Sequence, residues 1–267
     1  MSVLRVGVMP YLLGRPLVRG LATHAASDLR LVEDVPSAIG QLLIDGELDA
    51  ALAPIAMTLA HPELCVIPGL GVACDGPVAS IKLFHRVPPE ELTRVALDTS
   101  SRTAALLTQV LLRTRFGVAP DFVHAEPDLD AMLEKAGGAL LIGDNALVAS
   151  GPPYLDLGEE WKAHTGLGFV FAMWAYSPTL ERTRQAQLAE LLYASLARGE
   201  AELEQILEEP TPPRPLTPEA ARRYLTENIR YRLQEVHLRG LERFVELATD
   251  LDLLPEDTRV PQGAWAP

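Results

Sequence analysis

Short apolar runs alternate with amphipathic segments through the first two thirds of the chain. Apolar runs with the length expected of buried strands occupy residues 3–9, 29–33, 48–53, 95–98 and 139–142. Several of the segments between them carry apolar residues at helical spacing, and prolines such as Pro16 and Pro36 stand where a first helical turn tolerates them. Strands that alternate with short helices are typical of parallel βαβ units, so the pattern predicts an α/β fold.

The alternation occurs twice along the chain, and this repetition predicts two lobes. A crossover is expected near residue 87, and the continuous apolar strand 169–176 is expected to return the chain to the first unit. We therefore assign residues 1–86 together with 173–267 to one lobe, and residues 87–172 to the other. Two α/β lobes joined by two crossovers place a ligand cleft between them, where strand carboxyl ends meet helix amino ends.

The C-terminal third has the pattern of a helical region. Its apolar spacing predicts helices at 179–198, 201–208, 218–233 and 238–250. A stiff, proline-rich connector is expected at 210–218, between the second and third of these helices. We expect this helical region to belong to the first lobe.

A hydroxyl-rich turn joins the apolar strand 95–98 to the long helix that follows it. Its residues are Asp98, Thr99, Ser100, Ser101, Arg102 and Thr103. The first turn of a helix presents unpaired N–H groups and a partial positive charge, which together suit a carboxylate or a phosphate. A cation is disfavoured there by ~0.3–1 kcal/mol, so Arg102 indicates an anion beside it, either a ligand or Asp98. The alternative is a well-capped core helix without a ligand.

Three further positions lie where an open α/β sheet binds ligands. Tyr11 and Leu13 follow the first strand, and Asp144 follows strand 139–142, where it serves either as a helix cap or in a site. Ser80 lies on the predicted strand 78–84, whose one face mixes polar and apolar residues and so indicates a cleft wall. The alternative for Ser80 is a hydroxyl bonded to a neighbouring backbone group.

Composition narrows the classes of partner. The 267 residues carry a net charge of −13, which would repel nucleic acid and anionic membrane surfaces. No apolar run approaches the ~18–20 residues of a membrane span, and no signal peptide is recognised, so we expect a cytoplasmic protein. Cys65 and Cys74 lack metal-ligand spacing and are expected to be buried free thiols. The six histidines are scattered, and no common catalytic signature is present.

The chain resembles a known family through seven segments in order. These are 10–17 (PYLLGRPL), 46–54 (GELDAALAP), 80–84 (SIKLF), 97–103 (LDTSSRT), 141–144 (LIGD), 156–161 (DLGEEW) and 224–231 (YLTENIRY). They are similar to the chorismate dehydratases of the futalosine route of menaquinone biosynthesis. The resemblance implies a periplasmic-binding-protein-like (type II) fold with two lobes. It also implies a lyase that removes water from chorismate to give 3-[(1-carboxyvinyl)oxy]benzoate, without a metal or an organic cofactor.

The resemblance and the pattern together give a set of candidate site residues. Ser80 and Asp144 are the candidate catalytic residues. The candidates for binding the anionic substrate are Tyr11, Leu13, Arg15, Thr99, Ser100, Ser101, Arg102, Thr103, Gly143 and Asn145. No residue is assigned to a metal. Because no histidine or lysine stands in a matching motif, a carboxylate of the substrate itself is the expected base.

The first turn departs from the family pattern. Family members commonly read Ser-Tyr-Leu-Asn where this chain has Pro10-Tyr-Leu-Leu13, and an asparagine amide is a natural partner for substrate. The Leu13 side chain cannot form a hydrogen bond, so Arg15 or a backbone group is expected to replace the amide, or the chain uses a related substrate or acts slowly. Two alternatives follow: a 1,4-dihydroxy-6-naphthoate synthase of the same pathway, or a non-catalytic protein that binds an aromatic acid. The synthase carries a histidine and a glutamate where this chain has Gly143-Asp144, which argues against it.

Overall fold

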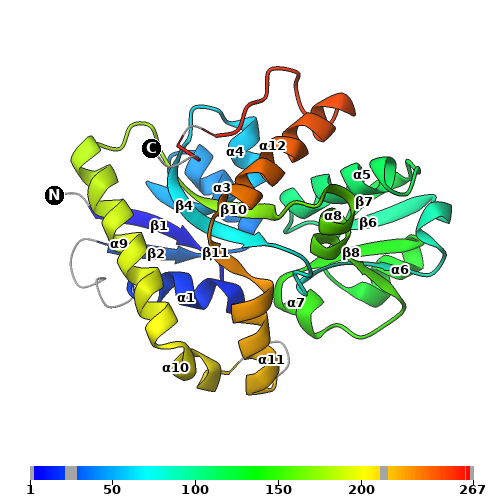
Figure 1. Ribbon diagram of the computed structural model, residues 1–267, viewed down its shortest axis with the longest axis horizontal. Helices are drawn as coiled ribbons and strands as arrows, with labels where there is room; N and C mark the ends of the chain where they lie inside the picture. Colours follow the sequence, from blue (N-terminus) through cyan, green and yellow to red (C-terminus); the bar gives the residue numbers. More distant parts are fainter. Residues whose placement is uncertain (1–2, 22–28, 211–215, 262, 265–267) are drawn as a thin grey trace.

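A computed structural model describes residues 3–21, 29–210, 216–261 and 263–264. It shows two α/β lobes side by side, with the C-terminal segments lying along the first lobe (Figure 1). The predicted α/β fold with a helical C-terminal region is confirmed. Most of the expected connector, residues 211–215, lies outside the described residues. Within the described part of the chain, no helix is long and apolar enough to cross a membrane.

The first lobe is built on a six-stranded sheet of order β11-β4-β10-β3-β1-β2. Its strands are β1 (Leu4–Val8), β2 (Leu29–Glu33), β3 (Ala50–Pro54), β4 (Cys65–Cys74), β10 (Phe169–Tyr176) and β11 (Arg230–Arg232). Strand β1 runs parallel to β2 and β3, as the alternation predicts, whereas β10 runs antiparallel to β3 and β4. The sheet is therefore mixed, because β10 returns from the second lobe.

The second lobe is built on a five-stranded sheet of order β7-β6-β8-β5-β9. Its strands are β5 (Ile81–His85), β6 (Arg94–Asp98), β7 (Asp121–Ala125), β8 (Gly138–Ile142) and β9 (Tyr154–Asp156). Strand β6 is parallel to β7 and β8, and β5 is antiparallel to β8 and β9. Both central parallel strands, β1 and β6, lead directly into a turn and a helix.

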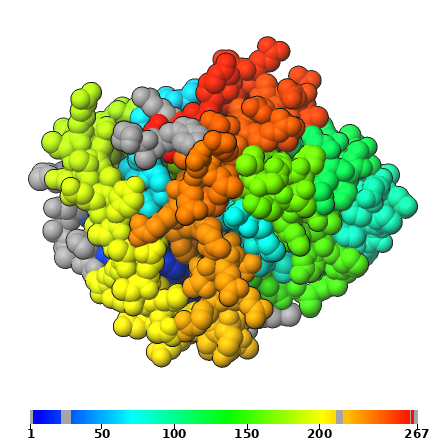
Figure 2. Space-filling model, viewed as in Figure 1, coloured from blue at the N-terminus to red at the C-terminus, as the bar shows by residue number. Residues whose placement is uncertain are grey.

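Short helices connect the strands of each lobe, and longer helices follow the return strand. Those of the first lobe are η1 (Leu12–Gly14), α1 (Arg15–Val18), α3 (Pro36–Ile44), α4 (Ile55–Ala60), α9 (Arg182–Ala201), α10 (Leu203–Glu208), α11 (Pro218–Arg223) and α12 (Glu235–Asp250). Those of the second lobe are η2 (Pro89–Glu91), α5 (Thr103–Thr114), α6 (Leu129–Lys135), α7 (Gly143–Val148) and α8 (Leu157–Thr165). Figure 2 shows the surface of α11 to α12 between the surfaces of α9 and α10 and of the second lobe.

Sheet pairing changes at positions slightly different from the expected lobe boundaries. Residues 81–85 were assigned to the first lobe, but as strand β5 they pair within the second sheet. Strand β10 begins at Phe169 and pairs throughout with the first sheet. The boundaries at 86 and 172 stay a prediction about domains, and pairing favours crossovers that lie a few residues earlier.

The segment 218–233 is not a single helix, and that prediction is wrong. Helix α11 ends at Arg223, a π-helical turn spans Tyr224–Asn228, and strand β11 follows at the edge of the first sheet. Pairing of β11 with β4 requires an extended backbone, which overrides the local helical spacing. The π-helical turn places Tyr224 and Asn228 against residues 77–80, the segment that leads into β5.

A cluster of aromatic rings joins the two lobes. Trp161 of α8 packs on Phe169 of β10 and Phe244 of α12, with ring centroids 5.2 and 6.1 Å apart in edge-to-face geometry. Trp161 and Trp174 are both fully buried, as expected for core residues. Fully buried aromatic side chains contribute strongly to stability, so this cluster fixes α8 and α12 against the return strand.

Candidate functional site

A cavity of about 530 Å³, including its opening, lies between the two lobes. Its walls come from the turns after β1 and β6, the start of β5, and strand β10. The lining is mainly apolar, with Tyr11, Ser80, Ser101, Arg102 and Thr103 as the polar side chains. A mainly apolar cleft with a few convergent polar groups is the usual form of a small-molecule site.

The carboxylate of Asp98 organises the hydroxyl-rich turn. Asp98 Oδ1 accepts from the Ser100 backbone N–H at 2.9 Å and from Ser100 Oγ at 2.5 Å, and Oδ2 accepts from Ile142 N–H at 3.3 Å. Burial raises the pKa of Asp98, and these three hydrogen bonds oppose the rise. Asp98 therefore ties the turn to the end of β8, and it forms no ion pair with Arg102 among the described residues.

The first residues of α5 both cap the helix and line the cavity. Ser101 Oγ accepts from Ala104 N–H at 3.2 Å, so Ser101 fills the capping role. Thr103 Oγ1 donates to the Phe171 carbonyl at 3.1 Å and accepts from Ala56 N–H at 3.2 Å, which fixes the start of α5 against the first lobe. The two expectations for this turn, a capped helix and a cavity wall, are therefore compatible.

Arg102 is the cation that lines the cavity. Its side chain is exposed, and no hydrogen bond or ion pair to its guanidinium group occurs within the described ranges. An arginine can bind a carboxylate through two parallel hydrogen bonds. The group is therefore available to an anionic ligand at the mouth of the cavity.

Thr99 and Ser100 lie behind the wall that Ser101 and Arg102 form. The Thr99 hydroxyl donates to the Glu126 carboxylate at 3.4 Å, and the Thr99 carbonyl accepts from Ser37 Oγ at 3.3 Å. The backbone N–H of Ser37, at the start of α3, donates to the Ser100 carbonyl at 3.2 Å. These two residues thus connect the lobes and do not line the cavity.

Tyr11 and Leu13 form the opposite wall. The Tyr11 ring packs against Gly143, where an added Cβ would lie 2.9 Å from ring carbons, and Gly143 has a left-handed φ of +65°. Burial raises the pKa of Tyr11 to about 12, and a hydrogen bond with Ser100 opposes the rise. The Leu13 side chain is an apolar part of the wall, and its carbonyl accepts from the Tyr231 hydroxyl at 2.9 Å. Contact with the Tyr11 ring therefore requires glycine at 143.

Asp144 joins the lobes behind this wall. Both of its carboxylate oxygens accept from Leu12 N–H, at 3.0 and 3.1 Å. Burial raises the pKa of Asp144 to about 6, against the opposing effects of the Leu12 hydrogen bond and the charge of Arg15. Asp144 does not line the cavity, and its neighbour Asn145 is exposed and does not line it either.

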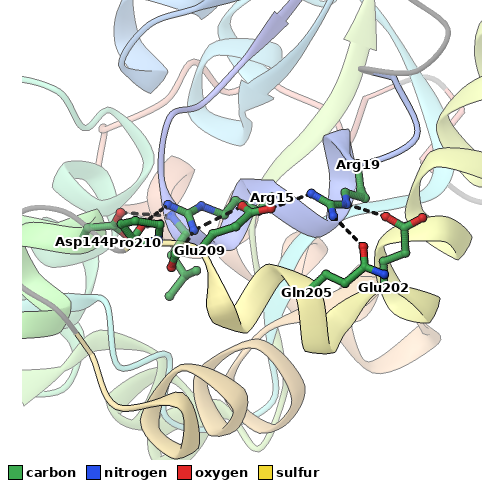
Figure 3. Close-up of polar contacts among 8 residues, drawn as sticks. Arg15, Arg19, Asp144, Glu202, Gln205, Glu209 and Pro210 are labelled. Carbon is green, nitrogen blue, oxygen red and sulfur yellow. Dashed lines mark hydrogen bonds and ion pairs between the residues drawn. The ribbon is translucent and has the colours of Figure 1, made fainter.

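Arg15 points toward Glu209 and Pro210, the residues that follow α10 (Figure 3), and it is not among the residues that line the cavity. Its guanidinium group donates to the Pro210 carbonyl at 2.5 Å and lies 3.5 Å from the Glu209 carboxylate. Arg19 lies on the same side and pairs with Glu202 and Glu209, each at 2.6 Å. Arg15 therefore ties the first turn to α10 and does not line the cavity.

Ser80 lies at the end of a tight turn and not within a strand. The residue before it, Ala79, has a left-handed φ of +64°, and β5 begins at Ile81. The Ser80 side chain lines the cavity and is buried, and its Oγ accepts from the Tyr224 hydroxyl at 2.8 Å. The sequence suggested a ligand or a backbone group as the partner of the Ser80 hydroxyl, whereas the structure shows a tyrosine side chain.

Comparison with known proteins agrees with this architecture. Residues 4–250 match the family described as menaquinone biosynthesis. The chain belongs to this family. It is 32% identical over 261 residues to a chorismate dehydratase of Thermus thermophilus, which spans 89% of this chain and 94% of that protein.

Solved structures show the fold of this family member. Protein AF1704 of Archaeoglobus fulgidus has a TM-score of 0.78 at 17% identity, covering 94% of this chain and 98% of the other. The periplasmic aliphatic sulphonate binding protein SsuA of Escherichia coli has a TM-score of 0.62 at 17% identity, covering 99% and 98%. The periplasmic-binding-protein-like fold is therefore confirmed.

The family member's cavity brings together seven of the twelve candidate residues. Those that line it are Tyr11, Leu13, Ser80, Ser101, Arg102, Thr103 and Gly143, and those outside it are Arg15, Thr99, Ser100, Asp144 and Asn145. Sequence reasoning did not assign Tyr224 or Asp156 to the site. The Asp156 carboxylate accepts from the N–H groups of Val78 and Ala79 at 2.9 and 2.6 Å, and from two N–H groups at the start of α8. The bonds to Val78 and Ala79 join residues 78 and 77 positions apart, and no local pattern specifies them.

Proposed function

We propose that this protein is a chorismate dehydratase, a lyase that converts chorismate to 3-[(1-carboxyvinyl)oxy]benzoate and water. The observation that carries the proposal is a mainly apolar cavity lined by the hydroxyls of Ser80 and Ser101 and by Arg102, whose guanidinium group has no partner among the described residues. The ring of chorismate suits the apolar walls, and its carboxylates suit the cation and the hydroxyl donors. The 32% identical relative of that name supports the same reaction.

The reaction requires positioning more than a strong protein base. A proton leaves the ring carbon that bears the enolpyruvyl ether, the C–O bond of the neighbouring hydroxyl breaks, and water is released as the ring becomes aromatic. Among the residues that the structure describes, no aspartate, glutamate, histidine or lysine lines the cavity. We therefore propose that a carboxylate of the substrate, held by Ser80 together with Ser101 and Arg102 of the hydroxyl-rich turn, accepts the proton. In this proposal Asp144 acts on the first turn through Leu12 and does not contact substrate.

Incubation of the purified protein with chorismate, followed by chromatography, tests the reaction directly. We expect the benzoate product to accumulate without an added metal or organic cofactor. The variants Ser80→Ala and Ser101→Ala should each lower kcat/KM about tenfold or more, because each loses a hydrogen bond to a charged group. Near wild-type rates in both variants would contradict the role of the held carboxylate.

A second candidate function is a non-catalytic binding protein for an aromatic acid. The apolar Leu13 side chain favours it, since no polar side chain of the first turn reaches the cavity apart from Tyr11. Thermal stabilisation by chorismate without formation of product would support this function. Product formation by the wild-type protein, at a clearly lower rate in a Ser80→Ala sample prepared in the same way, would exclude it.

A further inference from the structure

Tyr224 lies directly behind Ser80 and donates a hydrogen bond to its hydroxyl oxygen. Both residues are 1% exposed, and the Tyr224 hydroxyl donates to Ser80 Oγ at 2.8 Å. A phenol is a stronger acid than an alcohol, so Tyr224 is the natural donor of this pair. No protein acceptor for the Ser80 proton is found in the described ranges, and Ser80 lines the cavity. The free proton of Ser80 is therefore available to a ligand.

The backbone around Ser80 is held from two sides. Asp156 accepts from the N–H groups of Val78 and Ala79, and the Asn228 amide donates to the Pro77 carbonyl at 2.9 Å. These bonds hold Ala79 at its left-handed φ, which a residue with a side chain seldom adopts. The backbone that leads into Ser80 is thus held independently of Tyr224, whose hydrogen bond acts on the Ser80 side-chain hydroxyl.

The tyrosine itself depends on an irregular segment. Tyr224 and Asn228 are the first and last residues of the π-helical turn between α11 and β11. Such turns are rare and occur frequently at functional sites. The turn places both side chains against residues 77–80, although that segment is some 150 positions away in sequence.

We propose that Tyr224 is a positioning residue that orients the Ser80 hydroxyl as a hydrogen-bond donor to a carboxylate of the substrate. The inference rests on the proposed function, because chorismate supplies that carboxylate. Tyr224 acts through Ser80 and does not touch the ligand. Its removal should therefore have no effect once the Ser80 hydroxyl is absent.

A double-mutant cycle with chorismate as substrate tests this dependence. We expect Tyr224→Phe to lower kcat/KM about tenfold and Ser80→Ala to lower it at least as much. The double variant should be within about twofold of Ser80→Ala alone. Tyr231→Phe is the matched control, because it removes another buried phenol hydroxyl, one that donates to the Leu13 carbonyl. Its effect, whatever its size, should multiply with that of Ser80→Ala.

The outcomes separate the inference from the proposed function. If the wild-type protein does not convert chorismate, the proposed function fails and the inference fails with it. If the wild-type protein is active but Tyr224→Phe keeps its rate, or its effect multiplies with that of Ser80→Ala, only the inference is overturned. Should Tyr224→Phe lose its thermal unfolding transition, 3-fluorotyrosine at position 224 replaces it. That residue keeps the ring and the hydroxyl, which is a stronger hydrogen-bond donor than the hydroxyl of tyrosine. We therefore expect a rate within twofold of wild type or higher, and a tenfold loss would overturn the inference.

Discussion

The turns after β1 and β6 occupy equivalent positions in their lobes but use their polar groups differently. In the first turn, Leu12 N–H donates to Asp144, and the Leu13 carbonyl accepts from Tyr231. The Arg15 side chain donates to the Pro210 carbonyl after α10. In the second turn, the Arg102 guanidinium remains unpaired in the described part of the chain. Equivalent positions therefore do not imply equivalent functions. The first turn is an apolar wall and a tie between lobes, and the second is the anion-binding side.

The largest expected effect comes from removing the cation of the second turn. Arg102→Ala should weaken chorismate binding about 10- to 100-fold, because a hydrogen-bonded ion pair with a carboxylate contributes about 1.5–3 kcal/mol. The Arg102 side chain is exposed and has no partner in the part of the chain that the structure describes, so the free energy of unfolding should stay within about 0.5 kcal/mol of wild type. Isothermal titration and urea unfolding measure the two quantities.

The variant Arg102→Lys is the matched control for charge. It should recover part of the affinity, since lysine keeps the charge but cannot form two parallel hydrogen bonds. Unchanged affinity in Arg102→Ala would contradict the assignment of the turn after β6 as the anion-binding side.

An intermediate effect is expected at the tie of the first turn, and it depends on pH. The folded pKa of Asp144 is about 6 against a reference of 3.8, so between these values the folded state binds the proton and the unfolded state does not. Stability from this group is therefore highest below pH 4 and falls as the pH rises to about 6. Asp144→Asn keeps an acceptor for Leu12 N–H but loses the titration. When the pH is raised from 4.5 to 7.5, the free energy of unfolding of Asp144→Asn should increase by about 1–2 kcal/mol relative to that of the wild-type protein.

Urea unfolding of both proteins at these two pH values measures that gain. Asp98 is also buried with a raised pKa, but it is present in both proteins and cancels in the comparison. A difference that does not change with pH would mean that Asp144 is ionised at the same pH in the folded and unfolded states.

Local sequence identified the elements better than the partners of individual side chains. Strand β10 has the predicted bounds, 169–176, because a continuous hydrophobic run determines them directly. Asp144 was correctly noted after a strand, but its partner Leu12 is 132 positions away and no local pattern specifies it. Tyr224 lies within the predicted helix 218–233, and its partner Ser80 is 144 positions away, so no local pattern specifies that contact either.

Hydroxyl-rich turns are readable because they act locally. Ser101 accepts from the Ala104 N–H three residues ahead, and Asp98 accepts from Ser100 two residues ahead. Both partners therefore lie within the same short stretch of sequence. The cavity between the lobes combines this local signal with contacts that only the fold creates. The direction of the Arg15 side chain depends on such a contact, with Pro210, and the structure places this side chain outside the cavity, contrary to its assignment to the substrate.

The smallest expected effect comes from Arg15→Ala, and it tests the comparison most sharply. The Arg15–Glu209 pair is partly exposed, with side chains 23% and 38% accessible, so its loss should cost only about 0.5–1 kcal/mol of stability. Chorismate affinity should change less than twofold, because the guanidinium group faces α10. Arg15 is the first residue of α1 and Arg102 directly precedes α5, so both lie between a central parallel strand and its helix, and the same titration on Arg15→Ala and Arg102→Ala compares them directly. An equal loss of affinity in the two variants would show that Arg15 leaves α10 and turns into the cavity when the ligand binds, and the two turns would then bind the anion together.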